Sequence, residues 1–375
     1  MKRLYKKFVR WLHNFGYSFE RKVIFLLEWY AILRKRKLYK HIKWTKEQKR
    51  EFDNYWKKHY GKKISPRWHK LYEALSGTYR INYIPEIIFT TKIEPTMNDY
   101  NYCKVLSDKN LLGILFDNRI KGVRTPKTII ANSNGCFYDA ELNVISKKNA
   151  LEIINDIGFA VVKPTVDSSS GKNVSIVNIQ NGIDVRKNIG TSEIFDAYKS
   201  NFVVQEKIFP HKELSTLYPN SINTFRIISY MIDGVIDIAP LSMRIGGCNS
   251  EVDNIHAGGM SIKIDKNGHL AKYAYRLGYG DSSEKLVVHP NTNIEFGTYS
   301  ISYVGKLVDA AKALHSFLPH IGVVSWDLTI DSDGNIVIVE ANLKGQSAWF
   351  PQMLSGEPLF GENTDKVLKC VRKKK

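Results

Sequence analysis

Two short runs of apolar residues near the end of the chain predict a β-hairpin. Residues 323–330 and 336–340 are rich in Val and Ile, and Asp, Ser and Gly fill residues 331–334 between them. Such a composition is typical of a tight turn between antiparallel strands. We therefore expect two neighbouring, paired strands in this part of the chain.

Three side chains on this hairpin carry oxygen atoms that can bind a metal: Asp327, Glu340 and Asn342. Paired strands bring distant carboxylates together, and residues two apart on a strand point to the same face. Mg²⁺ prefers such oxygen ligands and usually completes its shell with nucleotide phosphates and water. The alternative interpretation is that the three are polar surface residues near the strand ends.

The pattern elsewhere alternates between helical and extended segments. Residues 44–79 have helical spacing interrupted by two glycines and a proline, and residues 107–116 predict a helix capped by Ser107 or Asp108. Short strands are expected at residues 83–90, 128–131, 158–164, 174–179, 202–210, 223–230 and 237–245. This mixture predicts an α+β fold.

The N-terminal segment predicts a basic amphipathic helix. Five apolar side chains recur at helical spacing between lysines and arginines: Leu4, Phe8, Trp11, Leu12 and Phe15. Residues 23–33 are mostly apolar, but the run is too short to span a bilayer and no small-residue cleavage site of a signal peptide follows it. One interpretation is a pair of helices on an anionic membrane surface; the other is a basic helical subdomain packed against the protein.

The net charge of +18 is concentrated at the two ends of the 375-residue chain. Residues 1–75 contain 22 Lys or Arg against six Asp or Glu, and the last ten residues contain six Lys or Arg and no acid. We find no nucleic-acid recognition motif to accompany this charge, so no nucleic-acid partner is expected. The size and the 43% hydrophobic content predict a large core in two or three domains.

The four cysteines indicate a reducing compartment. They are scattered without a CxxC pair or a histidine at metal spacing: Cys103, Cys136, Cys248 and Cys370. This usage argues against a zinc site and against a disulfide framework. We therefore expect a cytoplasmic protein, with peripheral contact to the inner face of the membrane if the N-terminal helices bind lipid.

A strand followed by a polar loop predicts a phosphate-binding element. Lys163 stands near the end of the strand at 158–164, and the loop after it contains Ser168, Ser169, Ser170 and Gly171. Backbone N–H groups of such a loop can close over phosphates, and the lysine can supply positive charge. It is not a Walker loop, because a strand rather than a helix follows it. A plain flexible hairpin loop is the alternative.

Two arginines lie on further predicted strands. Arg226 and Arg244 could hold a transferred phosphate or a developing oxyanion, or they could be ordinary surface residues. Downstream, Gly258 and Gly259 indicate a bulge or a close approach of two backbones.

In order and spacing, these pieces resemble the ATP-grasp superfamily of carboxylate-amine ligases, over roughly residues 80–355. A closer likeness is to the sugar-transfer-associated ATP-grasp proteins of bacterial surface-polysaccharide synthesis. The motifs that carry it are YIP at 83–85, SDKN at 107–110, NTFR at 223–226, DNIHAGG at 253–259 and VEAN at 339–342.

The resemblance implies a role for each candidate residue. The phosphates would be held by Lys109, Lys163 and the loop of Ser168, Ser169, Ser170 and Gly171. The adenine would be framed by Gln205, Glu206, Lys207 and Ile208, and the ribose would be bound by Glu213. The phosphate and the intermediate would be stabilised by Arg226 and Arg244, and Mg²⁺ would be held by Asp327, Glu340 and Asn342. Lys172 departs from the small residues usual at its position, which leaves its role open.

The implied fold is two α+β lobes gripping ATP, preceded by a basic, mainly helical N-terminal region. The expected divisions are residues 1–79, a preceding segment 80–131, a lobe with the phosphate loop 132–210, a lobe with the metal site 211–365, and a basic tail 366–375.

The implied activity is ATP-dependent ligation of an amine to a carboxylate through an acyl phosphate, with Mg²⁺ or Mn²⁺ as cofactor. The partners would be a glycan or glycan precursor and an amino acid. His256 would either deprotonate the amine or orient its loop. A phosphotransferase on a glycan precursor and a non-catalytic, membrane-associated assembly partner remain as alternatives.

Overall fold

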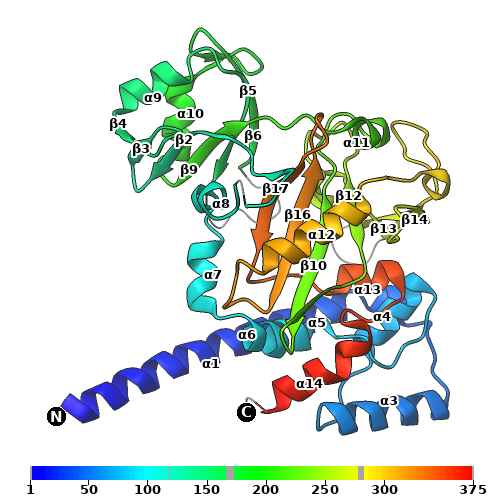
Figure 1. Ribbon diagram of the computed structural model, residues 1–375. Helices are drawn as coiled ribbons and strands as arrows, with labels where there is room; N and C mark the ends of the chain where they lie inside the picture. The colour runs from blue at the N-terminus through cyan, green and yellow to red at the C-terminus, as the bar shows by residue number, and fades with distance from the viewer. Residues whose placement is uncertain (1, 118, 166–172, 278–282, 374–375) are drawn as a thin grey trace.

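The computed structural model describes residues 2–117, 119–165, 173–277 and 283–373. Its strands form two separate sheets, and helices cover both (Figure 1). The α+β class expected from the sequence is confirmed. The predicted loop residues Ser168, Ser169, Ser170, Gly171 and Lys172 lie outside the described residues.

The smaller sheet follows the order β4-β3-β2-β9-β5-β6-β7-β8. Its strands are β2 (Thr128–Ser133), β3 (Cys136–Tyr138), β4 (Val144–Ile145), β5 (Gly158–Pro164), β6 (Ser175–Gln180), β7 (Ile183–Asp184), β8 (Ile189–Gly190) and β9 (Phe202–Glu206). Helices α9 (Lys147–Ile153) and α10 (Thr191–Tyr198) lie beside this sheet, at the top of Figure 1. Residues such as Phe195 and Phe202 fill the apolar core between the helices and the sheet. Each adjacent strand pair in this sheet is antiparallel.

The larger sheet follows the order β1-β17-β16-β10-β12-β13-β14-β15, with β11 paired to β10. Its strands are β1 (Val123–Arg124), β10 (Phe225–Ile232), β11 (Val235–Ile238), β12 (Ser242–Ile245), β13 (Met260–Ile264), β14 (Leu270–Leu277), β15 (Ser283–Leu286), β16 (Val323–Ile330) and β17 (Ile336–Asn342). Helix α12 (Val304–His315) crosses this sheet, and Leu307, Ala311 and Leu314 enter its core. The predicted hairpin is confirmed, because β16 and β17 pair antiparallel across the expected turn.

The remaining helices lie mostly before the smaller sheet. They are α1 (Lys2–Arg34), α2 (Arg36–Tyr39), α3 (Lys46–His59), α4 (Arg67–Ser76), α5 (Glu86–Ile88), the π-helix η1 (Phe89–Ile93), α6 (Glu94–Met97), α7 (Tyr100–Leu106), α8 (Lys109–Phe116), α11 (Lys212–Leu217), α13 (Trp349–Ser355) and α14 (Thr364–Lys373). Short 3₁₀ turns occur at Ile255–Ala257, Phe296–Thr298 and Gly361–Asn363. The helix expected at 107–116 begins at Lys109, where the Asp108 side chain caps it by accepting from the Asn110 N–H.

The strand predicted at residues 83–90 is wrong. Residues 86–97 are helical, through α5, η1 and α6. A short apolar run cannot by itself distinguish a buried strand from a buried helix. Here Ile88, Phe89 and Ile93 all turn into one core with α3 and α14, which a strand could not do because its side chains alternate between faces.

Two further strands are shorter than predicted. The segment expected at 237–245 is divided into β11 and β12 by Pro240, which lacks the N–H that a ladder needs. The segment expected at 202–210 leaves the sheet after Glu206.

Residues 366–373, expected within a basic tail, belong to α14, whose Val367, Leu368 and Val371 are buried.

The helical region supports the end of β17 with buried polar side chains. Glu94 accepts hydrogen bonds from the backbone N–H groups of Gly345 and Gln346 at 3.1 and 2.9 Å, and Glu86 accepts from Ala348 N at 2.9 Å. Both glutamates are buried. The chain that follows Asn342 is therefore held by side chains from the helices before the sheets.

Candidate active site

A cavity of about 860 Å³ lies between the two sheets. The smaller sheet contributes β5, β6 and the chain after β9, and the larger sheet contributes residues of β10, β12, β16 and β17. The C-terminal end of α1 and the start of α13 line it as well. The cavity thus receives side chains from segments that lie far apart in the sequence.

The strand register brings the predicted metal ligands together. Asp327 on β16 lies directly opposite Glu340 on β17, and Ser325 lies opposite Asn342. A register irregularity follows Asp327, where a bulge can re-aim a side chain. The Asn342 amide nitrogen donates to Ser325 O at 3.2 Å and to Asp327 Oδ2 at 3.5 Å. The three residues expected to share a site therefore do so.

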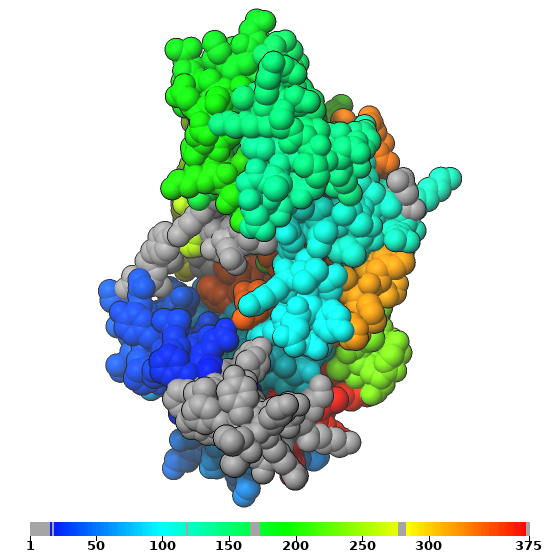
Figure 2. All heavy atoms as spheres, turned by 90° about the vertical axis from the view of Figure 1, so that its left-hand side faces the viewer, coloured from blue at the N-terminus to red at the C-terminus, as the bar shows by residue number. Residues whose placement is uncertain are grey.

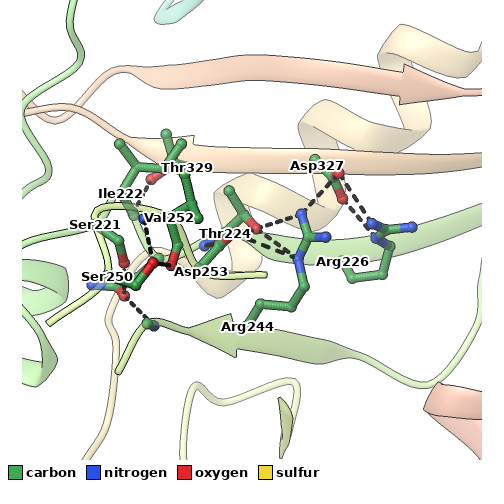
Figure 3. Close-up of polar contacts among 12 residues, drawn as sticks. Ser221, Ile222, Thr224, Arg226, Arg244, Ser250, Val252, Asp253, Asp327 and Thr329 are labelled. Atoms are coloured by element: carbon green, nitrogen blue, oxygen red, sulfur yellow. Dashed lines mark hydrogen bonds and ion pairs between the residues drawn. The ribbon is translucent and has the colours of Figure 1, made fainter. Parts of the chain in front are cut away.

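Asp327 is nearly buried and is paired with both predicted arginines (Figure 3). Arg226 Nε lies 2.6 Å from Asp327 Oδ1, and Arg226 also donates to Oδ2 at 3.1 Å. Arg244 Nη2 lies 2.9 Å from Oδ2. Burial lowers the pKa of Arg226 while Asp327 opposes this, but an arginine starts so high that both guanidiniums stay charged. One carboxylate thus holds two fixed positive charges at the cavity wall.

Thr224 and Asp253 position Arg244 from its other side (Figure 3). Asp253 accepts from the Thr224 N–H at 2.7 Å and from its hydroxyl at 2.5 Å, and the same hydroxyl accepts from Arg244 Nη2 at 2.9 Å. Burial lowers the pKa of Arg244, but Asp327, Asp253 and Glu340 outweigh it and hold the pKa above its usual value. Both residues belong to motifs found in the sequence, NTFR and DNIHAGG. Their role was not predicted, because only the fold shows what they contact.

Two lysines reach the cavity from different parts of the fold. Lys109, at the start of α8, places Nζ 2.9 Å from Glu340 Oε1, and Lys163 enters from β5. Both are buried, with exposed fractions of 5% and 7%. Burial, followed by repulsion from Lys109, lowers the pKa of Lys163 to about 8, although Glu340 opposes the shift. An anion placed between these lysines would be attracted by both.

The predicted adenine hinge lines the cavity where the smaller sheet ends. Gln205 donates to Thr128 Oγ1 at 3.3 Å, while its buried Oε1 accepts no hydrogen bond within the described part of the chain. Ile208 is buried, and the Lys207 ammonium lies 4.6 Å from the centre of the Phe159 ring. An unpaired buried acceptor beside apolar walls fits the amino group and flat ring of an adenine.

Glu206, at the end of β9, is bound to the chain around β1 and the start of β2. Its Oε1 accepts from Lys127 N at 2.8 Å and is ion-paired with Arg124. Arg124 also donates from Nε to Asp331 Oδ2 at 2.8 Å, in the turn between β16 and β17. Arg124 therefore connects the predicted adenine hinge of one sheet to the hairpin of the other that carries the predicted metal ligands, a connection that the sequence did not indicate.

Glu213, expected at the ribose, is engaged elsewhere. Its two carboxylate oxygens accept from the backbone N–H and the hydroxyl of Ser302, at 2.8 and 2.7 Å. It is not among the described side chains that line the cavity. His256 does line the cavity, as an exposed residue of a 3₁₀ turn.

The donor set at Asp327 fits Mg²⁺. Two carboxylates face each other across a strand pair, and the Asn342 amide, whose nitrogen bonds Ser325 O, can offer its oxygen. Among the described residues no group of three or more His, Cys, Asp or Glu forms a closed metal cage. A site with few protein ligands that leaves positions for phosphates and water is the usual arrangement for Mg²⁺ in phosphoryl transfer.

The part of the cavity lined by the N-terminal region and α13 was not predicted. Tyr30, Arg34 and Lys35 of the N-terminal region line it together with Trp349 and Phe350 of α13. The Lys35 ammonium lies 5.2 Å from the centre of the Trp349 ring. The signal in the sequence was slight, because these residues lie more than 300 positions apart and meet only through the fold.

Several solved structures are similar to this chain at low identity. They include the VanG D-Ala:D-Ser ligase of Enterococcus faecalis (13% identity, TM-score 0.38, covering 72% of this chain and 61% of that one) and an L-amino acid ligase of Bacillus licheniformis (14%, 0.36, 70% and 48%). The N5-carboxyaminoimidazole ribonucleotide synthetase of Thermotoga maritima is another (11%, 0.36, 78% and 63%). The chain thus spans about half to two thirds of the length of these proteins. A search of curated proteins found no match.

A family model decides the assignment. The model of sugar-transfer associated ATP-grasp proteins matches residues 89–367, which include both sheets and every cavity residue outside the N-terminal helices. This confirms the resemblance inferred from the sequence motifs. The chain belongs to the sugar-transfer associated ATP-grasp family.

Proposed function

We propose that this protein is an ATP-dependent carboxylate-amine ligase that works through an acyl phosphate, and that its substrates are an amino acid or other amine and a carboxyl group of a bacterial surface polysaccharide or its precursor. One observation carries the proposal. Asp327, Glu340 and Asn342 converge beside Arg226, Arg244 and Lys109 in a single cavity between two sheets.

The first step transfers the γ-phosphoryl group of ATP. A substrate carboxylate oxygen attacks the γ-phosphorus, the bond from that phosphorus to the bridging oxygen breaks, and ADP leaves with the electron pair. Lys163 and Lys109 attract the phosphates, and Arg226 and Arg244 offset negative charge on the transferred group. Bound Mg²⁺, or Mn²⁺ in its place, would be held by the three oxygen ligands and would neutralise charge on the β- and γ-phosphates.

The second step forms the amide bond. The amine nitrogen attacks the acyl carbon, the bond from that carbon to the phosphate oxygen breaks, and inorganic phosphate leaves. The nitrogen loses a proton in this step, and we assign the proton to His256, which lines the cavity. No side chain of this protein forms a covalent bond with the substrate, so its work is to position the substrates and to neutralise charge.

Measuring ADP formation with panels of uronic acids and amino acids tests the proposal. A ligase makes ADP in quantity only when Mg·ATP, a carboxylate and an amine are all present, and the amide product appears in equal amount. A stable phosphorylated glycan product without an amine would identify a phosphotransferase instead. A complete lack of turnover with every pair would favour a non-catalytic assembly partner.

Variants show whether any turnover arises at this site. We expect Arg244→Met to lower kcat by at least about a hundredfold, because it removes a preorganised charge from the phosphoryl-transfer site. Asp309→Asn, which changes an exposed carboxylate on α12, is the matched control and should leave kcat unchanged. Equal turnover by Arg244→Met and the wild type would contradict the assignment of this cavity as the active site.

A further inference from the structure

The N-terminal helix has an inner face that packs on the protein. Helix α1 is a single helix of 33 residues rather than the helical pair expected from the sequence. Ile32 is buried, and the pKa of Glu28 is raised by burial, with Lys35 opposing the shift. Glu20 forms an ion pair at 3.0 Å with Lys344, which follows β17. This half of the helix is therefore part of the fold.

The opposite face of α1 exposes a stripe of large apolar side chains, and this stripe is defined by Phe19, Val23, Leu26, Leu27 and Tyr30. Their exposed fractions lie between 39% and 62%. At 100° per residue these five positions fall within about 100° of one another, on the side away from Ile32 and Glu28. Phe25 and Trp29 of α1 are also exposed, at 48% and 45%, and lie outside this stripe. An apolar face of this kind on a soluble surface marks a site of interaction.

The sequence continues the stripe toward the N-terminus and surrounds it with positive charge. Leu4, Phe8, Leu12 and Phe15 carry the same helical spacing, and the first 75 residues hold 22 Lys or Arg against six acids. In Figure 1 this end of α1 projects away from the two sheets. No helix among the residues that the structure describes is long and apolar enough to cross a membrane. An apolar helix face in a segment rich in Lys and Arg is typical of a helix that lies in the interface of an anionic bilayer.

The apolar stripe also leads to the cavity. Leu27 and Tyr30 belong to the exposed stripe and line the cavity between the sheets as well. Arg34 and Lys35 line the same cavity and carry positive charge. A surface that binds the stripe therefore lies next to the part of the cavity that α1 lines. In Figure 2 the blue part of the N-terminal region lies on the same face as the cyan chain around α7 and α8.

We propose that α1 docks this protein on an anionic membrane through its apolar stripe, so that the part of the cavity lined by Leu27 and Tyr30 lies close to the lipid surface. Apolar side chains enter the headgroup region, and the basic residues of the N-terminal region attract anionic lipids. The excess of Lys and Arg in the N-terminal region is complementary to an anionic lipid surface, and this complementarity favours a membrane as the occupant of the stripe. This inference stands independently of the chemistry in the cavity.

Flotation of the full-length protein with vesicles tests the docking directly, without nucleotide or substrate. We expect flotation with vesicles of phosphatidylcholine and phosphatidylglycerol in equal parts, and little with phosphatidylcholine alone. Phe19→Gln combined with Leu26→Gln should lower the bound fraction by roughly tenfold, because two apolar groups leave the interface. Neither residue lines the cavity, so ATP binding by this variant should equal that of the wild type.

The matched control removes equally exposed apolar side chains from other helices. Val105→Gln in α7 combined with Ile114→Gln in α8 should float as the wild type does. The proposal is overturned if the wild type fails to float with the anionic vesicles, or if the α1 variant floats as well as the control. Because binding is measured without turnover, a failure of the ligase proposal would leave this result unaffected.

Discussion

At the scale of the residue, the polar contacts of the site converge on Asp327. Its carboxylate is shared by Arg226 and Arg244 and faces Glu340, which is paired in turn with Lys109. The two carboxylates partly offset the positive charge of the two arginines and the lysine before a ligand enters. Lys163 differs from the two arginines, because burial and repulsion from Lys109 lower its pKa to about 8.

Lys163 should make ATP binding dependent on pH. Its pKa of about 8 in the ligand-free protein means that it is mostly charged below pH 8 and mostly neutral above it. Phosphates favour the charged form, so the affinity for a non-hydrolysable ATP analogue should fall as the pH rises through about 8. Isothermal titration calorimetry between pH 7 and pH 9.5 measures this fall. We expect the affinity to decrease by about tenfold, because one charge pair is lost.

Lys163→Arg supplies the control for this titration, because an arginine stays charged throughout that range. The affinity of this variant should change little with pH. A wild-type affinity that is equally flat would show that Lys163 does not contact the phosphates.

At the scale of the element, Asn98 connects β16 to the chain directly after β17, at one end of the strands that carry the predicted metal ligands. Its amide nitrogen donates to Val323 O at 2.8 Å and to Leu343 O at 2.7 Å, and its oxygen accepts from Gly322 N and Val323 N at 2.9 and 2.8 Å. All four capacities of one buried amide are used. The register that sets Asp327 opposite Glu340 depends in part on this clamp.

Replacing Asn98 with Ala should strongly destabilise the protein. Buried backbone groups of β16 and of the chain after β17 would lose their partners, at a cost of about 2–4 kcal/mol in the free energy of unfolding. Urea denaturation followed by circular dichroism measures it. Asn101→Ala, an exposed position in α7, should change the same free energy by less than about 0.5 kcal/mol. Equal effects of the two substitutions would refute the clamp.

Elements with local signals were predictable from the sequence, and contacts between distant elements were not. The β16–β17 hairpin and α8 carry turn and cap residues beside their apolar runs, so their positions could be predicted. Residues 86–90, within the predicted strand, have β-branched and aromatic side chains but fold as helix because Ile88 and Phe89 pack into one core with α3 and α14. Thr224, Asp253 and Arg124 act through partners that no spacing reveals, and Glu213 was assigned by resemblance to a site that it does not line.

At the scale of the whole molecule, the cavity is built by both sheets. Lys163 and Gln205 come from the smaller sheet, and Arg244 and Asp327 come from the larger one. A nucleotide that fills the cavity would therefore contact both, and it would stabilise the folded chain as a unit.

Mg·ATP should raise the melting temperature through contacts with both sheets. At a ligand concentration of about 100 Kd, the expected stabilisation is about 2.7 kcal/mol. Differential scanning fluorimetry with a non-hydrolysable analogue should show the increase in the wild type, and both Lys163→Met and Arg244→Met should reduce it. Lys187→Met, an exposed position after β7, is the control. An increase unaffected by either cavity substitution would place the nucleotide elsewhere.

The most direct test of the account measures how Mg²⁺ changes the affinity for a non-hydrolysable ATP analogue. In the wild type we expect Mg²⁺ to tighten binding by about tenfold or more, relative to binding in EDTA. Asp327→Asn and Glu340→Gln should each remove this gain, while Asp309→Asn retains it. In Asp327→Asn the metal-free affinity should not fall, because Arg226 and Arg244 lose the carboxylate that neutralises them. A Mg²⁺ gain that persists undiminished in both site variants would contradict the assignment of Asp327, Glu340 and Asn342 as the metal ligands.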